Sequence, residues 1–217
     1  MQARQVRIPP LGLDGTLTLP RDSSAVVLFA HGSGSSRLSP RNIRVSTALC
    51  KAGLGTLLFD LLTEEEAADR ANVFDIGLLA DRLLLATNWL RMEAGLQKPS
   101  IGYFGASTGA AAALVAAAHA ANEVGAVVSR GGRPDLAGEA LAKVKAPTLL
   151  IVGGNDDVVL DLNRAALTRL RCEKKLEIVP GATHLFEEPG TLEQVMALAQ
   201  NWFCRHFVGA PETRRHV

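Results

Sequence analysis

Short runs of apolar residues alternate along the chain with longer stretches in which apolar residues recur every three or four positions. The short runs are typical of strands buried on both faces of a sheet, and the longer stretches are typical of amphipathic helices. Strands, some with the loop that follows them, are predicted for Ala25–Gly32, Leu54–Leu62, Ser100–Gly105, Val124–Gly132, Ala146–Asp157 and Lys174–His184. Helices are predicted for Ser39–Lys51, Asp75–Ala94, Ser107–Asn122, Asp135–Ala142, Leu160–Arg171 and Thr191–Phe207.

This alternation predicts an α/β domain with a mostly parallel sheet that is covered by helices on both faces. A short opening pair of strands, "QVRI" and "LDGTLTLP", is expected before it, with a turn at Asp14-Gly15. We expect one domain over residues 1–208 and a flexible tail over residues 209–217. Between Arg130 and Pro147 there is room for one short helix only, so no large lid is expected there.

The composition of the 217 residues is that of an ordinary globular protein, with 47% hydrophobic and 21% charged residues. A net charge of +1 favours neither nucleic acid nor an anionic membrane as a partner. The N-terminus lacks the apolar core of a signal peptide, and the longest apolar run, Gly109–Ala121, is too short to span a bilayer. We therefore expect a cytoplasmic protein whose partners are a small-molecule substrate and, at most, a second copy of the chain.

The three cysteines, Cys50, Cys172 and Cys204, are widely spaced along the chain. This spacing indicates neither a disulfide framework nor a zinc site, and each cysteine is predicted to be a small buried hydrophobe. No metal and no cofactor are expected.

Polar residues and glycines follow nearly every predicted strand. In chain order these segments are "HGSGSS", Asp60, "GASTG", "SRGGRPD", "GGNDD" and "PGATH". The carboxyl ends of parallel strands share one edge of a sheet, and ligands bind at that edge. The pattern therefore predicts a functional site at the carboxyl edge.

The segment "YFGASTG" places Ser107 between two glycines. The G-x-S-x-G pattern alone is weak, and a tight turn between a strand and a helix is the alternative interpretation. Here the pattern follows an apolar strand and opens a helix, which is the setting of a nucleophile elbow. Ser107 is therefore the candidate nucleophile, and it needs a base to accept its proton.

Among the five histidines, only His184 lies on a loop that directly follows a late strand. His119 is deep in a predicted helix, His206 and His216 are near the chain's end, and His31 is expected to shape the glycine-rich loop that follows it. His184 is therefore the candidate base.

The base needs a carboxylate that orients its ring and stabilises the imidazolium. "GGNDDVV" offers Asp156, which we prefer because it follows the strand by the shorter reach, and Asp157 as an N-cap-like neighbour that stays open as an alternative. Asp161 falls inside the next predicted helix, where capping or solvation explains it. The order Ser107, Asp156, His184 is that of α/β-hydrolases.

Two backbone N–H groups are candidates for an oxyanion hole. One belongs to Thr108, the residue after the nucleophile, and the other to Ser33 in "HGSGSS". A phosphate-binding role for that loop is disfavoured, because the loop lacks both the P-loop and the G-x-G-x-x-G spacing.

These segments, in this order, resemble the α/β-hydrolase superfamily over nearly the whole chain, and within it the small dienelactone-hydrolase-like group. "LLFDLLTEEE" and "VVSRGGRPDLA" also resemble hydrolase domains that some bacteria fuse to a phosphoribosyltransferase domain. No phosphoribosyl-pyrophosphate loop is found here, so that activity is not expected. The resemblance implies a serine hydrolase of the esterase type. True dienelactone hydrolases use a cysteine where this chain has Ser107, a departure that counts against dienelactone as the substrate and leaves the triad intact.

Arg130 and Arg133 are candidates for binding an anionic group of the substrate, because arginine forks suit carboxylate or phosphate. Pairing with Asp135, Asp60 or Glu64 is their alternative role. Two other functions stay open: a non-catalytic binding protein on the same scaffold, and acyl transfer or a peptidase- or lipase-type hydrolysis.

Overall fold

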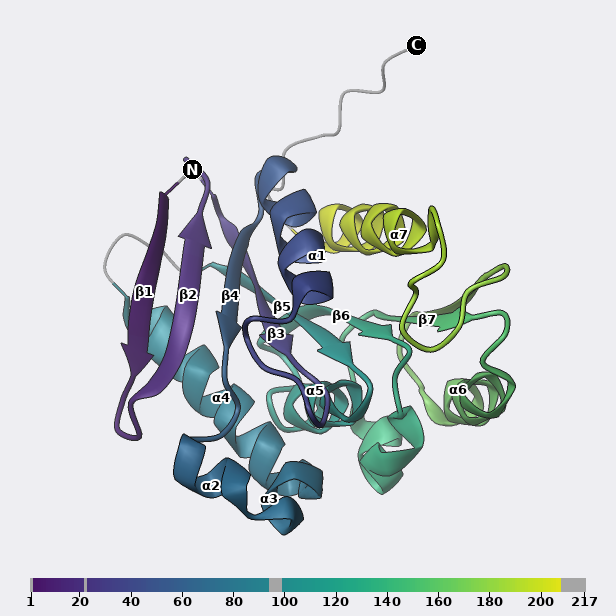
Figure 1. Cartoon of the computed structure of the whole chain (residues 1–217), viewed down its shortest axis with the longest axis horizontal. Coiled ribbons are helices and arrows are strands. Elements are labelled where there is room, and N and C mark those ends of the chain that lie inside the picture. Colours follow the sequence, from purple (N-terminus) through teal and green to yellow (C-terminus); the bar gives the residue numbers. More distant parts are fainter. Residues whose placement is uncertain (1, 22, 94–98, 208–217) are drawn as a thin grey trace.

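The computed structural model describes residues 2–21, 23–93 and 99–207. At the centre of this part of the chain is an eight-stranded sheet (Figure 1). The strand order is β1-β2-β4-β3-β5-β6-β7-β8. Strand β2 is antiparallel to both of its neighbours, and the strands from β4 to β8 are parallel. The strands are β1 (Gln2–Ile8), β2 (Leu13–Leu19), β3 (Ala25–Ala30), β4 (Gly55–Phe59), β5 (Ser100–Ala106), β6 (Val124–Arg130), β7 (Thr148–Gly153) and β8 (Lys174–Val179).

Helices cover both faces of this sheet, which confirms the predicted α/β architecture. On one face lie α1 (Pro40–Lys51) and α7 (Thr191–His206). On the other lie α4 (Ile76–Met92), α5 (Thr108–His119) and α6 (Asp157–Arg169). The short helices α2 (Glu64–Ala68), α3 (Arg70–Phe74) and the 3-10 helix η1 (Pro134–Lys143) lie at the lower edge of the sheet in Figure 1.

The apolar run of β3 is explained by burial on both faces. Val26 and Leu28 pack in the core beneath α4 and α5, whereas Val27 and Phe29 pack in the core beneath α1 and α7. None of these four side chains is more than 2% exposed. A strand buried on both faces needs no polar alternation, and therefore the run was recognisable in the sequence.

The alanine-rich helix α5 packs against α4, η1 and the sheet. Its alanines from Ala110 to Ala113 are fully buried. Small side chains let the helix axis approach the sheet closely, and this holds the N-terminus of α5 in a fixed place behind Ser107.

The predicted turn at Asp14-Gly15 is wrong. Ile8 pairs with Leu13 and Arg7 with Asp14, so the turn lies between them and ends at Gly12, whose φ is +72°. Gly15 is inside β2, where an added Cβ would lie only 3.2 Å from Phe59 Cβ. Gly15 therefore allows close packing between neighbouring strands and does not form a turn.

Several helix boundaries also differ from the prediction. A short helix, α2, was not predicted: Thr63 and Glu66 form a capping box at its start, and it ends before α3 and α4 begin. Helix α6 begins at Asp157, three residues before the predicted start. The predicted end of the long helix at Ala94 and the predicted tail at residues 209–217 lie outside the described residues.

All three cysteines are free thiols. Cys50 is buried as predicted, and burial raises the pKa of its thiol. Cys172 and Cys204 are only partly buried, so the prediction was wrong for these two. Within the described part of the chain, no helix combines the length and apolar character that crossing a membrane requires.

Candidate active site

Ser107 occupies the sharp turn between β5 and α5. Its backbone has φ +51° and ψ −123°, a conformation that residues with a side chain rarely adopt and that costs free energy. Backbone hydrogen bonds hold it there: the Ser107 N–H donates to the Arg130 C=O (3.4 Å), and its C=O accepts from the N–H groups of Ala110 (3.1 Å) and Arg133 (3.0 Å). Such a turn lifts the side chain away from the sheet, as in a nucleophile elbow.

The two glycines around Ser107 are required by close packing. A Cβ on Gly109 would lie 2.2 Å from Ala30 O and 2.4 Å from His31 O, where no atom fits. A Cβ on Gly105 would lie 2.4 Å from Ala110 Cα. The glycines of the motif thus allow β5, α5 and the end of β3 to converge beneath the serine.

His184 and Asp156 are joined by a hydrogen bond, with His184 Nδ1 2.7 Å from Asp156 Oδ2. With the proton on Nδ1 the ring donates to the carboxylate, and Nε2 is left to accept a proton. Asp156 is the N-cap residue of α6, yet its side chain makes no capping bond. Asp157 is instead the first residue of that helix, so Asp156 is the carboxylate that the structure pairs with His184.

The loops that hold this pair are tied to each other. The Asn155 N–H donates to the Ala182 C=O (2.9 Å), and a Cβ on Gly153 would lie 2.4 Å from the same oxygen. On the other side of His184, the N–H and hydroxyl of Thr183 donate to the Glu188 carboxylate at 3.1 and 2.6 Å. These bonds lower the pKa of Glu188 and close the loop that positions His184.

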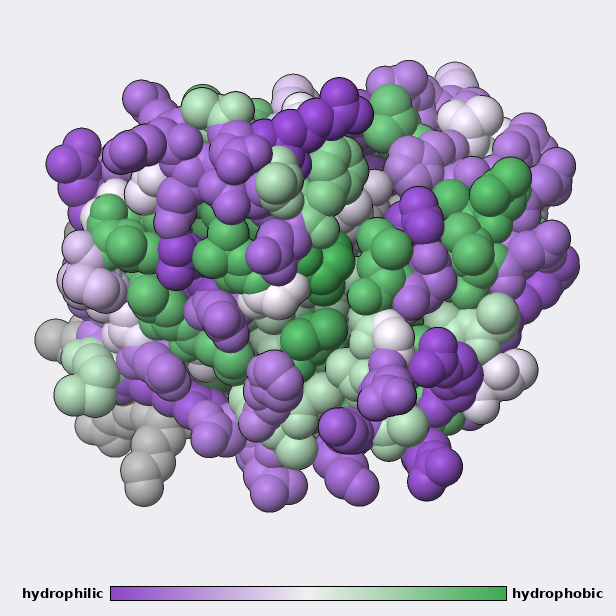
Figure 2. Space-filling model, turned by 90° about the horizontal axis from the view of Figure 1, so that it is seen from below, coloured by the Kyte–Doolittle hydropathy of each residue, from purple (hydrophilic) through white to green (hydrophobic). Residues whose placement is uncertain are grey.

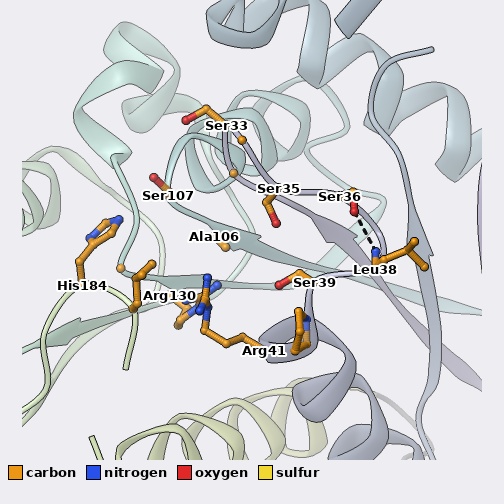
Figure 3. Close-up of a pocket in the computed structure, with 15 residues that line it drawn as sticks. Ser33, Ser35, Ser36, Leu38, Ser39, Arg41, Ala106, Ser107, Arg130 and His184 are labelled. Carbon is orange, nitrogen blue, oxygen red and sulfur yellow. Dashed lines mark hydrogen bonds between the residues drawn. The ribbon is translucent and has the colours of Figure 1, made fainter. Parts of the chain in front are cut away.

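Ser107 and His184 line the same cavity of about 730 Å³. Figure 3 shows the imidazole of His184 pointing toward the hydroxyl end of Ser107. On the face seen in Figure 2, apolar and polar residues are intermixed. Leu38 and Leu185 are exposed residues that line the cavity. The lining thus combines these exposed apolar residues with polar and charged side chains.

The glycine-rich loop after β3 lies against the start of α5. The Ser33 N–H, one of the two predicted oxyanion donors, donates to Thr108 Oγ1 at 2.9 Å. Thr108 supplies the other predicted N–H as the first residue of α5. His31 contacts this loop through Nδ1, which lies 3.1 Å from the Gly32 oxygen, and its Nε2 accepts from the Leu61 N–H after β4 at 3.1 Å. Burial lowers the pKa of His31.

The two predicted arginines have different surroundings. Arg133 forms a two-pronged ion pair with Asp135, at 2.9 and 2.8 Å, which raises the pKa of Arg133. It is not among the described residues that line the Ser107 cavity, so here the alternative role, pairing with Asp135, is the one observed. Arg130 does line the cavity, and so does Arg41 of α1, which the sequence analysis missed. Nothing in the sequence marks Arg41, because it lies inside the predicted helix Ser39–Lys51 and does not follow a strand.

The described residues hold no cluster of three or more His, Cys, Asp or Glu side chains placed to bind a metal ion.

Comparison with known protein families gives a match to the dienelactone hydrolase family over residues 13–203. The chain belongs to the dienelactone hydrolase family. This membership and the fold together support a hydrolase.

Similar proteins agree with this assignment at the level of fold. A dienelactone hydrolase from Anabaena variabilis is 55% identical, with a TM-score of 0.90 over 95% of this chain and 98% of its own. The esterase Est1E of Butyrivibrio proteoclasticus is 16% identical, with a TM-score of 0.79 over 94% of this chain and 98% of its own, and it shares the fold alone.

A curated relative from Mycobacterium tuberculosis, provisionally named as a phosphoribosyl transferase, is 59% identical over 205 residues. The match covers 94% of this chain but 46% of the relative. The chain thus spans about half the length of that relative, and the relative's name describes a longer protein.

Proposed function

We propose that this member of the family is a serine hydrolase that cleaves an ester bond through an acyl-enzyme on Ser107. One observation carries the proposal: a serine held in a strained turn faces the same cavity as a histidine that is hydrogen-bonded to a carboxylate. These three groups have the chemical types and the chain order of a hydrolase triad.

The reaction would proceed in two steps, formation of the acyl-enzyme and its hydrolysis. In the first, His184 Nε2 takes the proton of Ser107 Oγ while Oγ bonds to the ester carbonyl carbon, and the proton then passes to the departing alcohol. In the second, His184 takes a proton from water, the hydroxide oxygen bonds to the acyl carbon, and the proton returns to Ser107 Oγ as the acid leaves. Asp156 keeps the proton on Nδ1 and stabilises the imidazolium in both steps.

Labelling with a fluorophosphonate tests this proposal, because such probes bond to activated serines. We expect the native chain to gain one probe mass on the peptide that contains Ser107. Heat-denatured protein and Ser107→Ala should stay unlabelled. A native chain that neither takes up the probe nor turns over a short-chain chromogenic ester would point to the rival function, a non-catalytic binding protein.

Hydrolysis and acyl transfer are separated by adding an alcohol or amine during ester turnover. Water as the acceptor predicts that the free acid stays the main product. A product that is mostly the new ester or amide would make the protein an acyltransferase.

Thr108 is expected to act through its side chain as well as its N–H. Its hydroxyl holds Ser33 in place, so Thr108→Val should leave the second oxyanion donor misplaced and lower kcat for an ester by roughly 10- to 100-fold, with KM little changed. Thr108→Ser keeps the hydroxyl and should restore most of kcat. An unchanged or higher kcat in Thr108→Val would contradict this role and show that the hydroxyl only competes for the Ser33 N–H.

A further inference from the structure

A buried asparagine links α6 to the loop that follows β6. Asn163 is 0% exposed, and its side-chain Nδ2 donates to the Gly132 C=O at 2.9 Å and to the Val159 C=O at 2.7 Å. The bond to Gly132 joins α6 to a segment 31 residues away in the chain. Both N–H bonds of the side-chain amide are therefore used, and two carbonyl acceptors fix its orientation.

Asn163 occupies a position of α6 that favours an apolar residue. The buried residues of this helix are Val159, Leu160, Asn163 and Ala166, so the asparagine lies on the packed face. Its Oδ1 is buried and has no hydrogen-bond partner in the described part of the chain. A buried polar atom without a partner costs free energy, so packing alone does not explain an asparagine here.

The bond that Asn163 makes leads directly to the proposed nucleophile. The Gly132 C=O and the Arg133 N–H belong to one peptide group, and that N–H donates to the Ser107 C=O at 3.0 Å. A peptide group is planar, so fixing its carbonyl oxygen also fixes the direction of its N–H. Asn163 therefore acts on the backbone of Ser107 through a single rigid unit.

The same loop also contacts the base. A Cβ on Gly131 would lie 2.9 Å from the backbone oxygen of His184 and 3.6 Å from its Nδ1. Helix α6, which carries Asn163, begins directly after Asp156, the carboxylate that pairs with His184. Asn163 follows Asp156 by about two turns on the same side of the helix. The asparagine thus joins the helix of the acid to the loop that contacts both the serine and the base.

We propose that Asn163 is a positioning residue, which places Ser107 relative to the His184–Asp156 pair through the peptide group between Gly132 and Arg133. This inference rests on the proposed function, because the reactivity of Ser107 is what the asparagine supports. Ser107 has a strained φ of +51°, and such a conformation persists only where its surroundings hold it. Without the Asn163 donor the peptide group can turn, and the Arg133 N–H then no longer points at the Ser107 C=O.

Asn163→Leu tests the role, because leucine keeps the branching of the side chain and lacks the donor. We expect kcat for a short-chain ester to fall roughly 10- to 100-fold, since small displacements of a nucleophile have effects of this size. KM should change little, because Asn163 is not among the described residues that line the Ser107 cavity. A kcat equal to that of the wild type would overturn the proposal.

Ser129→Ala is the matched control. Ser129 Oγ is also buried without a partner, and it lies against Gly132, but no hydrogen bond between them is present in the described residues. This variant removes a buried polar atom beside the loop and leaves the Asn163 bond intact. Its kcat should stay within about twofold of the wild type. An equal fall in both variants would show that the loop is sensitive to any change nearby, and would overturn a specific role for Asn163.

The time course of fluorophosphonate labelling separates positioning from loss of the fold. A displaced Ser107 reacts slowly in every molecule, so the rate constant should fall about tenfold or more while the final extent still reaches one probe per chain. Partial unfolding would instead lower the final extent and leave the rate constant of the reacting molecules unchanged. That second pattern in Asn163→Leu would overturn the positioning role.

Hydrogen exchange tests the hold on the loop without catalysis. The Arg133 amide should exchange faster in Asn163→Leu than in the wild type, and Ser129→Ala should leave its exchange unchanged. A wild type that neither labels nor turns over an ester overturns the proposed function and the positioning role with it, and faster exchange would then mark Asn163 as a structural link. A reactive wild type with unchanged rate constant and exchange in Asn163→Leu overturns the positioning role alone.

Asn163→Asp gives a second route if Asn163→Leu does not fold. Aspartate matches asparagine in size, and its ionised carboxylate has no N–H to donate to the Gly132 C=O. The same fall in kcat and in the labelling rate constant is expected at neutral pH. Wild-type values for both in Asn163→Asp would overturn the proposal.

Discussion

Replacing Asp156 by asparagine is expected to lower kcat for a short-chain ester by roughly 1,000- to 10,000-fold. The carboxylate accepts the hydrogen bond of His184 Nδ1 at 2.7 Å, and an amide in its place can instead donate to that nitrogen. The ring would then carry its proton on Nε2, where it cannot accept the proton of Ser107. Because asparagine has nearly the same size as aspartate, Tm should change little. Steady-state kinetics and thermal unfolding measure both effects.

Asp157→Asn is the matched control for this prediction. Asp157 is adjacent in sequence and has the same chemistry, but it begins α6 and has no hydrogen bond to His184 among the described residues. We expect its kcat to stay within about twofold of the wild type, since a surface charge at a helix start contributes little to a reaction centre. A large loss in Asp157→Asn together with a small loss in Asp156→Asn would reverse the assignment of the acid.

Gly109→Ala is expected to destabilise the fold by about 3 kcal/mol or more, which for a chain of this length lowers Tm by roughly 6–12 °C. The added methyl group would lie 2.2 Å from Ala30 O and 2.4 Å from His31 O, and both are backbone atoms that cannot rotate away. Either α5 or the loop after β3 must shift. Because that loop contains Ser33, ester turnover should also fall, and calorimetry beside kinetics detects both losses.

Gly77→Ala separates this steric effect from a general effect of adding a methyl group. Gly77 lies in the first turn of α4, where the nearest atom to an added Cβ is the Asp75 side-chain oxygen at 3.3 Å. That side chain can give way, and alanine has the better helix propensity. The free energy of unfolding should therefore stay within about 1 kcal/mol. Similar Tm losses in both variants would refute the packing explanation for Gly109.

Much of the fold could be predicted because segments that are buried on all sides consist almost entirely of apolar residues. The apolar run of β3 and the alanines of α5 show this pattern, and both elements form within a few residues of their predicted positions. The turn at Gly12 and the separate helix α2 were missed, because a single glycine or a capping box fits more than one local structure.

The proposed reaction centre was also predictable in large part. In a parallel sheet the carboxyl ends of the strands meet at one edge, so Ser107, Asp156 and His184 were expected together although they are far apart in the chain. The hydrogen bond between His184 and Asp156 agrees with that expectation. Their catalytic roles remain predictions that the variants above test.

By itself the sequence determined the α/β fold, the elbow at Ser107 and the edge at which its partners would gather. These depend on local patterns of apolar, small and polar residues. Only the tertiary structure decided that Asp156 pairs with His184, that Arg133 pairs with Asp135, and that Arg41 and Arg130 line the same cavity. Such choices depend on the direction of each side chain after distant segments have packed, and chain spacing does not encode that direction.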